Sequence, residues 1–127
     1  ATTALCECIR AEGHDAVLLA LKRLYAWLWS KRKVAVQDWI DQLGVHAALV
    51  DLLNCPGKTL ALWTCYVIAA AALDHARNAK AFTEAVQDVL ANATPALRAA
   101  TARYEQDTQI AAAVSFAFAA YLPRGRK

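Results

Sequence analysis

The sequence predicts an all-α protein, and three observations support that prediction. Of the 127 residues, 58 % are hydrophobic, and many of these are alanine and leucine, which favour helix. Only four glycines and three prolines occur, and neither Asn-Gly nor Asp-Gly is present, so tight β-hairpins are not expected. Apolar residues recur at three- and four-residue intervals along much of the chain, as on the buried face of a helix.

The N-terminal part is predicted to form four helices. The first covers residues 3–11, and the second covers 15–31. Apolar residues mark the inner face of the second helix at Val17, Leu18, Leu21, Leu24, Tyr25 and Leu28. A short helix over 36–43 ends at Gly44, because glycine readily takes the left-handed conformation that closes a helix. The fourth helix covers 45–54 and stops before Pro56-Gly57.

The next predicted helix, over residues 59–73, is apolar on all sides. Only Thr64 interrupts the run from Leu60 to Leu73. This run is shorter than the roughly 20 residues that cross a bilayer, so no membrane span is expected. A helix that is apolar all round and this short is expected to be buried on several sides.

The C-terminal part is predicted to contain three more helical segments. One covers residues 78–91, and another, over 94–103, starts at a threonine followed by proline, a common helix start. Asp107 is expected to cap a final helix over 108–122. The basic residues 123–127 are expected to be a disordered tail, outside a single helical domain formed by residues 1–122.

The charge pattern argues against a nucleic-acid-binding protein. The net charge is only +3, and the basic residues do not gather along one face. Outside the tail, the one basic cluster is Lys31-Arg32-Lys33, which is expected at the end of a helix, where cations suit the helix dipole.

Neither the cysteines nor the charged residues predict a metal site or a disulfide framework. Cys6 and Cys8 are one residue apart, and Cys55 and Cys65 have no partner at the spacing of zinc ligands. They are expected to be small buried thiols, and no metal or cofactor is predicted. The lack of a disulfide framework favours an intracellular, cytoplasmic protein.

No catalytic residues are predicted, and we expect that the protein is not an enzyme. The pairs His14-Asp15 and Asp74-His75 are adjacent in sequence, which points their side chains apart on a helix. No phosphate-binding loop, nucleophile elbow or paired-histidine motif is present. The histidines are expected to be surface or capping residues.

Two segments of the chain are similar in sequence at an offset of 44 residues, and we call this similarity the internal echo. ALCECIRAEGHDAVLLALKRL, from Ala4, aligns without a gap on ALVDLLNCPGKTLALWTCYVI, from Ala48. Leu5 falls on Leu49, Glu7 on Asp51, Ile9 on Leu53, Gly13 on Gly57 and Leu24 on Ile68. A helical period of 40–47 residues is typical of armadillo and HEAT repeats.

Residues 48–85 resemble an armadillo repeat. ALVDLL is similar to the family's second-helix pattern, Pro56 lies at the break, and Leu60 takes the first inward position of the third helix. The copy before it has one extra residue, and a third copy, from Ala85, keeps AVQDVL and then diverges. The resemblance implies an armadillo-like, right-handed α-solenoid of about two repeats with a divergent C-terminal helical end. A compact helical bundle with an accidental echo is the alternative.

The resemblance also implies a binding face along the third helices. In the family, a tryptophan and, four residues later, an asparagine hold an extended peptide. Here those positions carry Lys22 and Tyr66, then Ala26 and Ala70, so this mode of binding is not expected. The exposed stripes would be Leu19, Lys22, Ala26 and Trp29 in the first copy, and Trp63, Tyr66, Ala70 and Leu73 in the second.

The predicted partner-binding residues are Leu19, Lys22, Trp29, Trp63 and Tyr66. An aromatic groove of this kind suits a helical or apolar partner segment. The competing interpretation is that Trp63 and Tyr66 are core residues, since aromatics at helical spacing mostly pack inside. Of the other tryptophans, Trp27 is expected in the core and Trp39 against a neighbouring helix, whereas Trp29 is expected at the rim.

The sequence therefore predicts a protein–protein interaction or scaffold module. Because the chain opens in mid-repeat, with Leu5, Cys8 and Ile9 needing cover, it is expected to belong to a larger protein or to self-associate. The alternative function is a helical bundle domain that binds a small apolar ligand or serves as a subunit of a complex.

Overall fold

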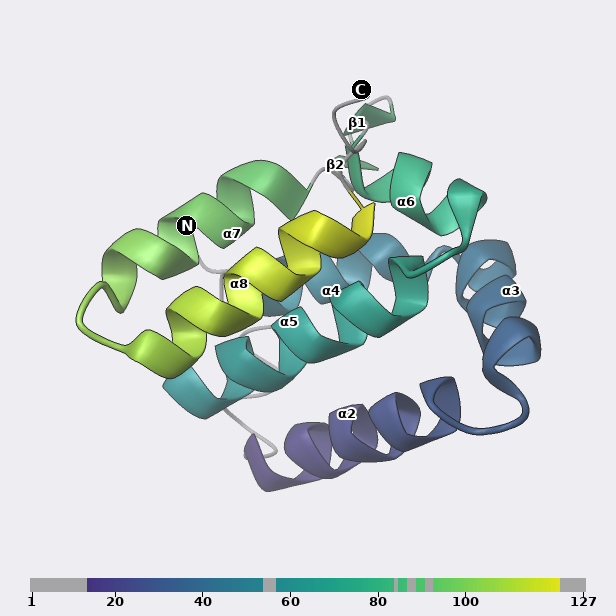
Figure 1. Ribbon diagram of the computed structural model, residues 1–127, viewed down its shortest axis with the longest axis horizontal. Helices are drawn as coiled ribbons and strands as arrows, with labels where there is room; N and C mark the ends of the chain where they lie inside the picture. The colour runs from purple at the N-terminus through teal and green to yellow at the C-terminus, as the bar shows by residue number, and fades with distance from the viewer. Residues whose placement is uncertain (1–13, 54–56, 84, 87–88, 91–92, 122–127) are drawn as a thin grey trace.

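The computed structural model describes residues 14–53, 57–83, 85–86, 89–90 and 93–121 (Figure 1). Within these ranges the chain forms helices α2 (His14–Leu28), α3 (Lys33–Leu43), α4 (Val45–Leu53), α5 (Lys58–Ala72), α6 (Ala76–Thr83), α7 (Ala93–Arg103) and α8 (Thr108–Tyr121). Strands β1 (Ala85–Val86) and β2 (Val89–Leu90) form one short antiparallel pair. The prediction of a helical protein is confirmed.

The helices are arranged around α5. Helix α2 packs along one side of α5 and α8 along the other, and all three run in the same direction (Figure 1). Helices α4 and α7 form a second layer behind them, while α3 and α6 pack at the end where α2 and α5 finish (Figure 1). Helix α5 therefore contacts α2, α3, α4, α6 and α8.

Small side chains allow this close packing around α5. Ten of its 15 residues are buried, and Ala69, Ala70, Ala71 and Ala72 are among them. The hydroxyl of Thr64 donates to the carbonyl of Leu60 at 2.7 Å, which satisfies the one polar side chain in the buried part. The predicted burial of this helix on several sides is confirmed. Among the described residues, every helix is too short or too polar to span a bilayer.

Two predicted helix ends are confirmed by their capping geometry. Gly44 takes the left-handed conformation (φ 65°) after α3, and its N–H bonds the carbonyls of Ile40 and Asp41. Asp107 accepts the N–H of Ile110 at 2.9 Å at the start of α8. Its carboxylate also lies 2.8 Å from Lys58 Nζ on α5, and the hydrogen bond from Lys58 is the main reason why the pKa of Asp107 is lowered.

The predicted helix over residues 78–91 is wrong. Helix α6 stops at Thr83, and Ala85–Val86 then pairs with Val89–Leu90. The expectation that no hairpin would form fails here, and so does the comparison of AVQDVL with a second helix. The two β-branched valines, at positions 86 and 89, favour an extended backbone and lie directly opposite each other in the ladder.

Other predictions differ at their ends or cannot be compared. Helix α2 ends at Leu28, not residue 31, because the Ser30 hydroxyl donates to the Trp27 carbonyl at 2.6 Å and turns the chain. The predicted helix over 3–11 and the basic tail 123–127 lie outside the described residues.

A buried glutamine caps the C-terminal end of α5. Gln37 of α3 is only 2 % exposed, and its Nε2 donates to the carbonyls of Ala70 at 3.0 Å and Leu73 at 2.8 Å. The last carbonyls of a helix have no partner inside the helix, and a buried one is costly unless another group bonds it. Gln37 therefore ties α3 to the end of α5.

Asn78 of α6 completes this polar corner. Its Nδ2 donates to the carbonyls of Ala71 and Gln37, each at 2.9 Å. Its Oδ1 must then accept from His46 Nε2, 2.7 Å away on α4, so His46 carries a proton on Nε2. Asn78 is fully buried, and its amide joins α3, α4 and α5 to α6.

Replacing Gln37 by alanine should destabilise the fold. The variant leaves one buried and one partly buried carbonyl without their donor, so we expect the free energy of unfolding to fall by about 2–4 kcal/mol. Chemical denaturation measures this change. Gln42→Ala is the matched control on the same helix, because Gln42 is exposed, and it should change stability by less than about 0.5 kcal/mol. Equal losses in the two variants would contradict the capping role of Gln37.

Candidate functional site

Four aromatic rings from α2 and α5 form one contiguous cluster. Tyr25 lies at its centre, with its ring centroid 6.0 Å from that of Trp29, 5.6 Å from that of Trp63 and 5.6 Å from that of Tyr66. Trp63 and Tyr66 meet edge to face at 5.4 Å. The rings meet because Tyr25 and Trp29 are four residues apart on α2, Trp63 and Tyr66 three apart on α5, and the two helices pack side by side.

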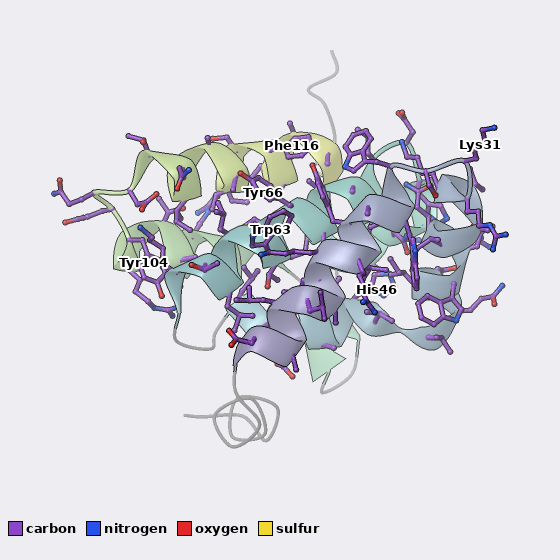
Figure 2. All side chains as sticks on the ribbon, turned by 90° about the horizontal axis from the view of Figure 1, so that it is seen from below. Lys31, His46, Trp63, Tyr66, Tyr104 and Phe116 are labelled. Carbon is purple, nitrogen blue, oxygen red and sulfur yellow. The ribbon has the colours of Figure 1, made fainter. Side chains whose placement is uncertain are left out.

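The surface around this cluster contains two cations, Lys22 over Trp63 and Lys33 over Trp29, and one exposed leucine. Lys22 Nζ lies 5.5 Å from the centre of the Trp63 ring, in cation–π geometry. Leu19, one turn earlier on α2, is 51 % exposed. We call the surface of Leu19, Lys22, Tyr25, Trp29, Trp63 and Tyr66 the aromatic face. Figure 2 shows Trp63 and Tyr66 on α5, with Phe116 on the neighbouring α8.

The structure brings together most of the residues predicted from sequence. Leu19, Lys22 and Trp29 are exposed, whereas Trp63 and Tyr66 are half-buried and pack against the core. The rings of Trp63 and Tyr66 thus pack against the core and also form part of the surface. Whether a partner binds these five residues stays a prediction.

One position of the predicted stripes turns out differently, and one residue outside the stripes belongs to the face. Ala70 is 1 % exposed, because α5 is enclosed by its neighbours at this level, so it is not part of the face. Tyr25, which the sequence places on the inner side of α2, is the residue that joins the other three rings. Its four-residue spacing from Trp29 is the signal that could have identified it.

The expectation that Trp27 is a core residue is wrong. Trp27 is 54 % exposed and Trp39 is 49 % exposed, and both line an open groove of about 750 Å³ between the end of α2 and the start of α3. The cations Lys31 and Arg32 also line this groove. Helix α2 ends before the basic triplet, so these cations precede α3 and do not sit in the last turn of a helix. Trp29 is 49 % exposed, as expected for a rim residue.

A second polar cluster joins α3 to α6. His75 Nε2 lies 2.8 Å from Asp38 Oδ1, and the N–H of Asn78 donates to His75 Nδ1 at 3.1 Å. His75 thus accepts a free N–H at the start of α6, as a helix cap does. Both ring nitrogens are engaged within the fold. The bond from His75 is the largest cause, ahead of Arg77, that holds the pKa of Asp38 below its usual value.

Cys65 is a buried free thiol. Burial raises its pKa to about 12, which keeps the sulfur protonated and poorly nucleophilic. The other three cysteines lie outside the described residues. Across the part of the chain that the structure describes, no three histidine, cysteine or acidic side chains are grouped to hold a metal ion.

Comparison with known proteins assigns neither a family nor a function to this chain. No family model, no curated protein and no solved structure matches the chain. The armadillo resemblance therefore rests on its own residues, and function has to be argued from the aromatic face and the groove.

The lowered pKa of Asp38 predicts a pH-dependent contribution to stability. The folded-state pKa lies below the unfolded value of 3.8, so the stabilisation is complete above pH 3.8 and is lost as the pH falls through the folded-state pKa. Asp38→Asn should lower stability at neutral pH and flatten its decline in acid, as measured by denaturant unfolding across this range.

The partners of Asp38 provide the control for this measurement. Because His75 contributes more than Arg77, Arg77→Gln should flatten the acid dependence less than His75→Gln does. If Asp38→Asn keeps the wild-type acid dependence, the hydrogen bond from His75 does not stabilise the carboxylate.

Proposed function

We propose that this chain is a protein–protein interaction module, and that its aromatic face binds a helical or apolar segment of a partner. One observation carries the proposal: four rings pack against one another on the outer side of α2 and α5, where the ring of Trp29 and the neighbouring Leu19 each leave about half of their surface exposed.

The energetics of such a surface favour binding. Aromatic side chains dominate the affinity of many interfaces, and a truncated anchor often costs 2 kcal/mol or more. Rings that already support one another lose little conformational freedom when a partner covers them. Lys22, held over Trp63, can contact an acidic or carbonyl group at the edge of the interface.

The shape of the partner follows from what the face lacks. Ala26 and Ala70 provide no side-chain amide to bond an extended backbone, and Ala70 is buried. An amphipathic helix needs no such bonds, because its backbone is satisfied internally and only its apolar face contacts a groove. The proposed partner segment is therefore helical.

We also propose the armadillo-like solenoid as the architecture. The parallel course of α2, α5 and α8 supports it, since third helices of successive repeats stack in this way, with α3–α4 and α6–α7 as the connecting pairs (Figure 1). A compact helical bundle is the alternative architecture. The proposed module has no catalytic role and no cofactor, and an intracellular location is part of the proposal.

Leu19→Asp should abolish partner capture without loss of stability. Leu19 is 51 % exposed, so the new charge disrupts the aromatic face and not the core. Tagged wild-type and variant chains are incubated with lysate of the source cells, and bound proteins are quantified by mass spectrometry. The matched control is Leu43→Asp, since Leu43 is 59 % exposed and lies outside the face.

The partner should be retained by wild type and Leu43→Asp and lost from Leu19→Asp, with equal melting of all three. Trp63→Ala/Tyr66→Ala should lose the same partner if the variant still folds. Sedimentation of the wild-type chain shows whether that partner is a second copy. A partner captured equally by the two aspartate variants would contradict binding at the aromatic face.

A further inference from the structure

We propose that the groove between α2 and α3 is a second docking site, separate from the aromatic face, for an acidic protein segment that carries one large apolar side chain. The groove is lined by Trp27 on α2, by Val36 and Trp39 on α3, and by the two cations Lys31 and Arg32. Its lining thus combines a large apolar surface with two positive charges.

The apolar part of the groove is available for a ligand. About half of each tryptophan surface is exposed, and Trp39 lies three residues after Val36, on the same side of α3. A volume of about 750 Å³ is within the usual range of ligand sites. One bulky side chain with the backbone on either side of it would fill this space.

The two cations have no acidic partner among the described residues. The carboxylates of α3 are engaged elsewhere: Asp38 bonds His75 and Arg77, and Asp41 bonds Arg77. Lys33, the third cation of the triplet, lies over the ring of Trp29, 5.4 Å from its centre. Lys31 points away from the helices at one end of the molecule (Figure 2). Lys31 and Arg32 are therefore left to meet an incoming anion.

The position of these cations makes an acidic ligand favourable. Arg32 is the N-cap residue of α3 and forms no side-chain capping bond, and Lys33 is the first residue of the helix. The dipole of a helix favours negative charge at its N-terminus, so the triplet is placed where cations are disfavoured. A carboxylate in the groove would be attracted by both the side chains and the helix end.

The groove is formed by a fixed turn. The Ser30 hydroxyl donates to the Trp27 carbonyl at 2.6 Å and accepts the N–H of Arg32 at 3.1 Å. The N–H of Lys33 donates to the Ser30 carbonyl at 3.1 Å. These three bonds hold the end of α2 and the start of α3 at a set angle. A ligand therefore meets a preformed site, which lowers the entropic cost of binding.

A concave site favours a peptide over a membrane surface. Tryptophan and basic residues also occur where proteins touch anionic membranes, but there the aromatic side chains protrude into the interface. Here Trp27 and Trp39 line the same recess. The chemistry that fits is an acidic peptide whose aromatic or leucine side chain enters between them.

The test uses the full chain and labelled peptides. The probe is a fluorescein-labelled peptide with one tryptophan flanked by glutamates. A second peptide has glutamines in place of the glutamates, and a third has alanine in place of tryptophan. Fluorescence anisotropy should show that the first peptide binds at least about tenfold more tightly than the other two. Its affinity should fall as salt is added.

Two pairs of variants locate the site. Trp39→Ala and Lys31→Glu should each weaken binding of the acidic peptide by about tenfold or more. Their matched controls are Val34→Ala, an exposed apolar residue of α3 outside the groove, and Arg98→Glu, an exposed cation on α7. Both controls should bind as wild type does. Circular dichroism verifies folding, and the charge reversal keeps the test valid if Trp39→Ala misfolds.

Several results would overturn the proposal. They are no binding of the acidic peptide, equal binding of the glutamine peptide, or unchanged affinity in Lys31→Glu. Binding to vesicles of phosphatidylcholine and phosphatidylserine in place of the peptide would assign the groove to a membrane. Leu19→Asp, which changes the aromatic face and not the core, should still bind the peptide, so failure of the aromatic face and failure of the groove are distinguishable.

Discussion

The buried C-terminal end of α5 is the constraint on which the arrangement of the other helices depends. A helix end exposes carbonyls that water normally bonds, and α5 ends inside the protein. Every carbonyl oxygen from Ala69 to Leu73 accepts a hydrogen bond, and the Gln37 and Asn78 amides supply those that the backbone does not. These amides can reach the carbonyls only if α3 and α6 lie against this end, so the polar corner fixes both helices.

The enclosure of α5 also determines where surface is left for binding. Its neighbours cover most of it and leave Trp63 and Tyr66 half-buried, so the more exposed apolar residues have to lie on helices that pack along one side only. Helix α2 is such a helix, because Leu21 and Leu28 are its only buried residues among the side chains described. The aromatic face and the groove both use α2. They lie on different sides of it, because Trp27 and Trp29 are two residues apart on the helix and point in different directions.

Local sequence signals predicted most of the helices and several of their ends, whereas contacts between residues far apart in the chain could not be predicted from them. Gly44 and Asp107 cap by bonds to residues within four positions, so their neighbours in the sequence suffice to identify them. The bonds between Gln37 and α5 span more than 30 residues, and no local pattern indicates them. Trp27 was misplaced because a helix with several apolar stripes does not reveal which stripe faces inward.

The two surfaces relate differently to folding, because their rings have different surroundings. Trp63 and Tyr66 support the core as well as the aromatic face, so truncation there changes stability and binding together. Trp27 and Trp39 leave about half of their area in water, and an exposed ring contributes little hydrophobic free energy to the folded state. Folding alone therefore does not account for two tryptophans beside Lys31 and Arg32, which have no acidic partner in the part of the chain that the structure describes. A bound acidic segment would account for this arrangement, since it removes the exposed rings from water and neutralises the charges at the same place.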